Sequence, residues 1–546
     1  MNRIKHKNIV IYQLLPRLFG NMEGKNVYCG TIKENGCGKM EDVTSVALSS
    51  IRSLGCTYIW YTGLIEHATC TDYSKLGIPS SHSDVVKGKA GSPYAIRDYY
   101  DIDPDLACKV PNRMKEFENL LKRTHDCDLG FIMDFVPNHL AREYRSDAKP
   151  KDIQDFGETD DKKKSFSPMN NFYYLPEQSL SLPFVKMDAK DRYEEYPAKV
   201  TGNDCFTAMP SQNDWYETVK LNYGKDYQNP SNTSFSPIPN TWRKMLHILL
   251  YWASKGVDGF RCDMAEMIPV EFWHWSIWQV KERYPHILFI AEVYNPALYN
   301  SYANYGGFDY LYDKVGLYDT LKSVIQGHQS ASAITSCWQR LGNLQQRMLN
   351  FLENHDEQRI ASDYFAQDAW KGIPMILVSS LLQPSPFMLY FGQELGERGM
   401  EQEGFSGKDG RTTIFDYWSV ESLKRWNNHG KFDEKLLTPQ EKELRSLYKK
   451  ILSLREKEKC FREGTMYDIM YANYSNEAFD GNKLFAFLRS FKEEVCLVIA
   501  NFSSEEQRAK VVLPEGAFSF LELKSCDTQK EWKDLLNEQT LFLPFS

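Results

Sequence analysis

Eight short apolar segments, distributed over most of the chain, constrain the fold more than any other feature of the sequence. Most are separated by stretches with helical periodicity, such as residues 114–126, where Phe117, Leu120 and Leu121 fall on one face of a helix. Strands that alternate with helices build a parallel sheet, and eight of them predict a closed (β/α)8 TIM barrel, an α/β fold. The segments begin near residues 8, 57, 130, 257, 286, 308, 348 and 386.

Two parts of the chain depart from this alternation. Residues 140–239 are rich in Asp, Lys, Tyr, Asn and Pro and have weak periodicity, which favours an inserted subdomain over a structureless loop. From about residue 463 the apolar residues alternate with polar ones, as in β-strands. We therefore predict a barrel of residues 1–139 and 240–460, an inserted subdomain after the third strand, and a C-terminal all-β domain, a β-sandwich, of residues 461–546.

The net charge and the cysteine content limit the classes of binding partner and the cellular location that we expect. The net charge is −8 and the basic residues do not cluster, which argues against nucleic acid or an anionic membrane as a partner. No apolar run reaches membrane-spanning length.

The twelve cysteines show no C-x-x-C and no paired Cys/His spacing, so reduced thiols are expected. The N-terminal stretch lacks a small-residue cleavage site and is predicted to be the first strand, so we expect a cytoplasmic location. The sequence indicates no oligomeric state.

Acidic and imidazole side chains follow four of the apolar segments, at the point where each predicted strand ends. In a parallel barrel these ends converge on one face, where active sites are built. Each group alone could be a helix cap or a surface salt bridge, but four together predict one site. The residues are Asp134, Asn138 and His139 after the third segment, Arg261 and Asp263 on the fourth, Glu292 on the fifth, and His355 and Asp356 after the seventh.

These segments resemble, in order and spacing, the four sequence regions of the α-amylase family of retaining glycoside hydrolases. They read DFVPNH (134–139), GFRCDMAE (259–266), AEVY (291–294) and FLENHDEQR (351–359). The stretch SPYAIRDYYDIDP (92–104) also looks like the family's second-strand loop. The resemblance implies cleavage of α-glucosidic linkages in α-glucans or malto-oligosaccharides, so an oligosaccharide or polysaccharide is the expected partner.

The resemblance also implies catalytic roles. Asp263 is the expected nucleophile, Glu292 the acid/base, and Asp356 the third carboxylate, which holds sugar hydroxyls. Retention needs two carboxyl groups about 5–5.5 Å apart, one ionised and one protonated. Arg261, on the same strand face as Asp263, would keep that carboxylate ionised, while Glu292, in a closed and partly apolar pocket, would keep its proton.

Further residues match the family's sugar-binding positions. His139 and His355 look like the imidazoles that hydrogen-bond the sugar in the cleavage subsite. Tyr94 looks like the aromatic platform under that sugar, with a role in the core as the alternative. Asp134 is expected to orient Arg261.

The sequence departs from starch-cleaving members at two places. Glu266 and Met267 stand where many of those members have Lys-His, and an acidic residue there also occurs in members that act on short oligosaccharides, which makes Glu266 a substrate-binding candidate. Lys220, in TVKLNYG, stands where an acidic calcium ligand is usual, and a cation cannot ligate calcium. Although Asn138 matches a family calcium ligand, we expect no required cofactor and no metal at the conserved site. A calcium bound elsewhere in the Asp- and Asn-rich insert stays open.

Two alternative functions stay open. A transglycosylase or isomerase acting on short α-glucosides would differ only in whether water or a sugar hydroxyl receives the glycosyl unit. A non-catalytic relative would typically have lost the nucleophile or the acid, whereas all three carboxylates are present here. Chain length, linkage preference and pH optimum are not predicted by the sequence.

Overall fold

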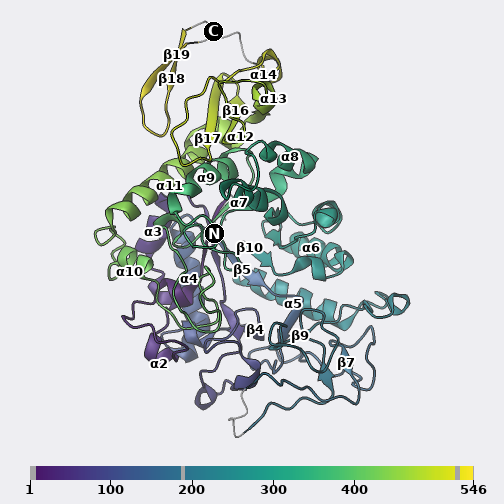
Figure 1. The fold of residues 1–546 in the computed structure, drawn as a ribbon. Helices are drawn as coiled ribbons and strands as arrows, with labels where there is room; N and C mark the ends of the chain where they lie inside the picture. The colour runs from purple at the N-terminus through teal and green to yellow at the C-terminus, as the bar shows by residue number, and fades with distance from the viewer. Residues whose placement is uncertain (1–7, 186–190, 523–528, 545–546) are drawn as a thin grey trace.

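Eight parallel strands form the centre of the protein and close into a barrel, in the order β1-β14-β13-β12-β11-β10-β5-β2 (Figure 1). The computed structural model describes residues 8–185, 191–522 and 529–544. All eight predicted strands are present, so the predicted TIM barrel is confirmed. Their bounds are β1 Val10–Leu14, β2 Tyr58–Tyr61, β5 Gly130–Phe135, β10 Gly259–Cys262, β11 Leu288–Ala291, β12 Tyr310–Tyr312, β13 Met348–Phe351 and β14 Phe387–Tyr390.

Helices surround the barrel and cover its outer face. In α4 the predicted apolar side chains Phe117, Leu120 and Leu121 are all buried. The longest helix, α11, begins with a capping box in which Thr438 and Glu441 satisfy each other's backbone N–H groups, which fixes where the helix starts. The main helices are α3 Ser45–Ser53, α4 Arg113–Asp126, α5 Asn240–Lys255, α6 Val270–Arg283, α7 Asp319–Ile325, α8 Ala333–Arg340, α9 Gly372–Leu381, α10 Glu421–Asn427 and α11 Pro439–Lys457.

The region between β5 and α5 folds as a small irregular unit beside the barrel, at the bottom of Figure 1. Short antiparallel pairs organise it: β6 (His139–Ala141) with β9 (Thr218–Lys220), and β7 (Tyr174–Leu175) with β8 (Ala198–Lys199). A small apolar cluster around Tyr173 and Val200 gives it a core of its own. The register of β6 and β9 sets His139 opposite Lys220, which brings the insert against the barrel face.

The C-terminal part lies at the top of Figure 1 and contains the predicted antiparallel β-structure. The strands β15 (Thr465–Asp468), β16 (Leu484–Phe491) and β17 (Glu494–Asn501) form one sheet, and β18 (Gln529–Lys533) pairs with β19 (Thr540–Pro544). Two short helices, α13 (Met470–Asn473) and α14 (Glu515–Phe520), accompany the strands. Helix α12 (Lys459–Glu463) joins α11 to the sheet.

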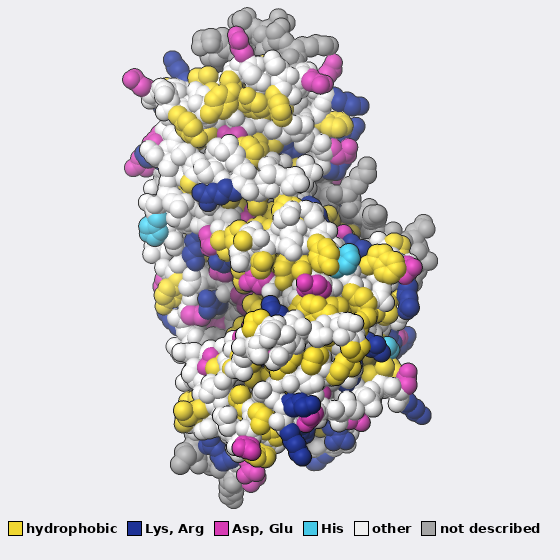
Figure 2. Space-filling view, turned by 90° about the vertical axis from the view of Figure 1, so that its right-hand side faces the viewer, with side chains coloured by type: hydrophobic (Ala, Val, Ile, Leu, Met, Phe, Trp, Pro, Cys, Tyr) yellow, Lys and Arg dark blue, Asp and Glu magenta, His cyan; other side chains and the backbone are white. Residues whose placement is uncertain are grey.

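The surface agrees with the mixed charge of the sequence. On the face shown in Figure 2, acidic and basic side chains of the described residues are interspersed with apolar ones, with no continuous basic patch. None of the described helices is both long and apolar enough to cross a bilayer.

Candidate active site

A cavity of about 320 Å³ opens at the carboxyl-terminal face of the barrel. Asp263 directly follows β10 and Glu292 directly follows β11, so the two carboxyls come from neighbouring parallel strands. The structure brings six of the predicted site residues to the wall of this cavity, and two others, Arg261 and Glu266, lie behind it. The six are Tyr94, His139, Asp263, Glu292, His355 and Asp356.

Arg261 is the cation that organises the site. Its Nη1 lies 2.7 Å from Asp263 Oδ1, and its Nη2 lies 2.8 Å from Glu292 Oε1. Asp134, opposite Arg261 in the β5–β10 register, is 3.6 Å from the same Nη1. The guanidinium carbon lies 5.0 Å from the centre of the Trp60 ring. One buried cation therefore serves three carboxyl groups, and it bridges the expected nucleophile and the expected acid/base.

Burial and the neighbouring charges change the pKa values of Asp263 and Asp134. Burial raises the pKa of Asp263 well above its usual range, and the nearby carboxyls of Glu292 and Asp134 add to that effect. Arg261, which was expected to keep this carboxylate ionised, lowers its pKa, but burial has the larger effect. Burial likewise raises the pKa of Asp134 to about 7. Asp263 and Asp134 therefore retain their protons to a higher pH than isolated aspartates would.

The two oxygens of Asp263 differ in their surroundings. Oδ1 accepts the hydrogen bond from Arg261, whereas none of the described residues donates to the buried Oδ2. Asp263 also lines the cavity. One oxygen therefore anchors the carboxylate, and the other keeps its lone pairs for a reacting atom.

Glu292 is held by two donors that the sequence did not indicate. Its Oε2 accepts the backbone N–H of Met264 at 2.7 Å, and its Oε1 accepts the hydroxyl of Tyr294 at 2.6 Å. Met264 has φ 44° and ψ 43°, a left-handed conformation that costs a non-glycine residue about 1–2 kcal/mol. This turn directly follows Asp263 and points the Met264 N–H at Glu292. The strained backbone conformation therefore fixes the position of the Glu292 carboxyl relative to Asp263.

His355 is fixed by a chain of hydrogen bonds. Gln13 Nε2 donates to Nδ1 at 2.9 Å, which leaves the ring proton on Nε2. That nitrogen lies 2.6 Å from the Tyr94 hydroxyl and 3.1 Å from Asp356 Oδ2. Burial lowers the pKa of His355 to about 3, with Arg261 acting in the same direction, so the imidazole is neutral at ordinary pH. Gln13 was missed, although a glutamine inside the apolar first strand is a visible signal.

The insert, together with His139 and with Lys87 from the stretch between β2 and β5, supplies another wall of the cavity. Burial lowers the pKa of His139 to about 3, and its ring lies 5.1 Å from that of Trp215. Beside them, Lys87 Nζ and Glu217 Oε2 form a buried ion pair of 3.1 Å. Trp215, Lys87 and Glu217 all line the cavity. The sequence offered no signal for these three, because Trp215 and Glu217 lie in the insert, which has no periodicity, and Lys87 lies in an irregular stretch between β2 and β5.

Glu266, a predicted substrate-binding residue, anchors the chain after Glu292. Its Oε2 accepts the backbone N–H groups of Tyr294 and Asn295 at 3.0 and 2.9 Å. Tyr294 is also the residue whose hydroxyl holds Glu292. The Glu266 carboxylate thus positions a donor of the acid/base candidate from behind the cavity wall.

We expect Glu266→Ala to lower kcat about tenfold, because a displaced Tyr294 would leave Glu292 less well oriented. KM for a malto-oligosaccharide should change much less, since Glu266 does not line the cavity. Glu266→Gln keeps an acceptor oxygen for both N–H groups and serves as the matched control, with kcat near that of the wild type. Equal losses in the two variants would show that charge rather than positioning matters.

At the position of the family's conserved calcium site lies a lysine, whose ammonium group cannot ligate calcium. Lys220 Nζ donates to Asn138 Oδ1 and lies 2.8 Å from Asp204 Oδ1, and Lys220 is only 1% exposed. Burial lowers the pKa of Lys220, while Asp204 opposes this. Calcium requires a shell of oxygen ligands, and an ammonium in the middle of these oxygens excludes one. The site residues therefore do not suit the metal, and the ammonium itself joins the insert to the barrel face.

Chelation of divalent cations should not affect the contacts of Lys220 that join the insert to the barrel. We expect excess EDTA to change neither the melting temperature nor the activity, whereas Lys220→Met should lower the free energy of unfolding by about 1–3 kcal/mol, because Asn138 and Asp204 lose their shared donor. Lys225→Met is the control, since Lys225 stacks on the same Tyr227 ring but is exposed. A melting temperature that falls with EDTA and recovers with Ca²⁺ would contradict this expectation.

The parallel barrel and the carboxylate-lined cavity at its carboxyl-terminal face place the protein among the (β/α)8 glycoside hydrolases. Residues 13–464 match the family model described as "Alpha amylase, catalytic domain", and the chain belongs to this family.

Known relatives and solved structures agree with this assignment. The chain is 22% identical to Alpha-amylase 3 of Dictyoglomus thermophilum, over 92% of this chain and 86% of that protein. It is 24% identical to trehalose-6-phosphate hydrolase of Bacillus subtilis, over 48% and 36%. Among solved structures, an alpha-amylase of Geobacillus thermoleovorans complexed with acarbose has a TM-score of 0.61 at 17% identity, covering 99% of this chain and 95% of that one. The structural likeness shows the shared fold.

Proposed function

We propose that the protein hydrolyses α-glucosidic linkages in α-glucans or malto-oligosaccharides with retention, by double displacement. The observation that carries the proposal is the asymmetry of Asp263, with Oδ1 held by Arg261 and Oδ2 without a donor among the described residues, beside Glu292 on the same guanidinium. Two carboxyls on neighbouring nitrogens of one guanidinium suit the spacing of about 5–5.5 Å that retention requires.

The proposed mechanism has two steps. Asp263 Oδ2 attacks the anomeric carbon while Glu292 gives a proton to the departing glycosidic oxygen, which forms a glycosyl-Asp263 ester. Glu292 then takes a proton from water, which attacks the same carbon and releases Asp263. Arg261, which contacts both carboxyls, stabilises the negative charge of Asp263 before its attack and that of Glu292 after the proton is given.

The surrounding residues would hold the sugar. Neutral imidazoles at His139 and His355 can donate and accept hydrogen bonds to hydroxyl groups without adding charge. Asp356, whose side chain is 43% exposed, would accept from hydroxyls at the cavity mouth, and the buried Tyr94 ring, stacked with His355 at 5.1 Å, would form a wall for the sugar ring. The relatives named as amylases and as a trehalose-6-phosphate hydrolase support an α-glucoside substrate.

Incubation with maltoheptaose tests the proposal. We expect only shorter malto-oligosaccharides, and their newly formed reducing ends should appear first as the α-anomer in a proton NMR time course. Longer or rearranged sugars would identify the transglycosylase or isomerase alternative. Initial release of the β-anomer would refute double displacement through Asp263.

A further inference from the structure

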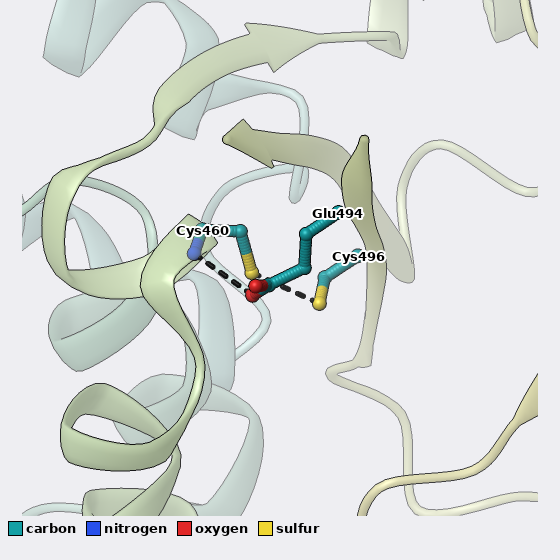
Figure 3. Close-up of side chains that lie close together, drawn as sticks. All are labelled: Cys460, Glu494 and Cys496. Atoms are coloured by element: carbon teal, nitrogen blue, oxygen red, sulfur yellow. Dashed lines mark hydrogen bonds between the residues drawn. The ribbon is translucent and has the colours of Figure 1, made fainter. Parts of the chain in front are cut away.

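Two cysteines meet where the barrel joins the C-terminal sheet. Cys460 lies on α12, Cys496 lies on β17, and their sulfur atoms are 3.0 Å apart (Figure 3). Figure 3 shows the two side chains pointing toward one another from the helix and from the strand, with Glu494 between them. We propose that Cys460 and Cys496 are a redox modification site that closes to a reversible disulfide and ties α12 to the C-terminal sheet.

The backbone around the thiols is held rigidly. Glu494 Oε1 accepts the N–H of Cys460 at 2.9 Å, and the buried Arg489, directly opposite Cys496 in the β16–β17 register, donates to the carbonyls of Phe461 and Gly464. Contacts from two strands thus fix the helix that carries Cys460. Since a disulfide forms readily only when the backbones already place the sulfurs together, this arrangement favours closure.

The geometry favours a disulfide over a metal site. The carboxylate of Glu494 and the two sulfurs are close enough to surround an ion. Two thiolates on a tetrahedral zinc, with Zn–S bonds of about 2.3 Å, would however lie about 3.8 Å apart. The observed 3.0 Å is shorter, and only three side chains of the described residues converge there.

The surroundings of the two cysteines indicate which thiol reacts first. Cys496 is half-buried and can be reached from solvent, whereas Cys460 is fully buried. The hydrogen bond with Cys496, burial and the neighbouring Glu494 raise the pKa of Cys460, so that thiol stays protonated until an acceptor takes its proton. The thiolate that leaves Cys496 in the second step of the exchange is that acceptor.

The reaction is a thiol–disulfide exchange with a low-molecular-weight disulfide, RSSR, as the oxidant. The Cys496 thiolate attacks RSSR, which forms Cys496–S–S–R and releases RS⁻. Cys460 then attacks the Cys496 sulfur and gives its proton to the departing RS⁻, which forms the Cys460–Cys496 bond and releases RSH. In total, two protein thiols are oxidised by two electrons and RSSR is reduced to two RSH.

The full-length protein provides the test. It is equilibrated in mixtures of reduced and oxidised glutathione, quenched with acid, alkylated and digested with trypsin without reduction. We expect oxidising mixtures to yield one peptide that joins residues 460–462 to 493–508 and is two hydrogens lighter than the sum of its parts. Thiol titration should show a loss of two thiols per chain, and dithiothreitol should restore both.

Variants define the controls. Cys496→Ser should abolish the cross-linked peptide, whereas Cys108→Ser, which removes an exposed cysteine outside the pair, should leave it unchanged. Oxidation should also raise the melting temperature of the wild type but not that of Cys496→Ser. A glutathione adduct on Cys496 with Cys460 still alkylated would overturn the proposal. So would one zinc per chain that is lost in Cys460→Ser and prevents the cross-link.

Discussion

Asp263→Asn is expected to lower kcat on maltoheptaose by about 10⁴- to 10⁶-fold, the range found when a covalent nucleophile is removed. The amide cannot form the glycosyl ester, because its lone pair is delocalised. The change also replaces one of three carboxyls that share Arg261, so it relieves repulsion in the buried cluster.

Folding and binding should therefore survive this substitution. We expect the melting temperature to equal or exceed that of the wild type, since the oxygen of the introduced amide can still accept a hydrogen bond from Arg261. Affinity for maltoheptaose, measured by calorimetry, should stay within about threefold. Hydrolysis at the wild-type rate would contradict the assignment of the nucleophile.

Glu292→Gln is expected to separate proton donation from nucleophilic attack. On maltoheptaose, kcat should fall by about 10³-fold, within the range for loss of a general acid. The kcat/KM for α-maltosyl fluoride, which reports only the first step, should fall by less than about tenfold because fluoride leaves without a proton, whereas kcat/KM for maltoheptaose should fall as much as kcat. Equal losses on both substrates would indicate that Glu292 has a structural role.

The same variant makes a prediction for the pH profile. Burial raises the pKa of Asp263, with Glu292 and Asp134 adding to the effect, and the nucleophile must be ionised to attack. Activity should therefore fall as the pH drops through this raised pKa, at a higher pH than an exposed aspartate would give. Removing the charge of Glu292 lowers the pKa of Asp263, so the acid limb of kcat/KM for the fluoride should move to lower pH in Glu292→Gln. An unmoved limb would show that the two carboxyls are not coupled.

Much of the barrel and its site was predictable because the signals are local. The alternation of apolar and helix-period segments predicted all eight barrel strands, since a strand buried on both faces needs a continuous apolar run. The polar residues at the ends of those runs, together with the family resemblance, predicted six side chains of one cavity. Parallel strands bring their carboxyl ends together whatever the detailed packing, so order along the chain was sufficient.

Contacts between distant parts of the chain were decided only by the tertiary structure. Gln13 and His355 are 342 residues apart, and nothing near either residue indicates the other. The same holds for Asp204, the second partner of Lys220, and for the wall residue Trp215. The motif that contains Glu266 likewise did not indicate the two backbone N–H groups that its carboxylate binds.

The sequence by itself determined which chemical groups stand at the ends of which strands, and hence the class of reaction. The tertiary structure decided how those groups share charge: one guanidinium among three carboxyls, an ammonium in place of a metal ion, and two thiols brought together from helix and strand. The physical reason is the distance along the chain between the residues that determine each property. Periodicity and strand order are encoded by neighbouring residues, whereas burial, pKa and the spacing of charges depend on atoms that meet only when the chain has folded.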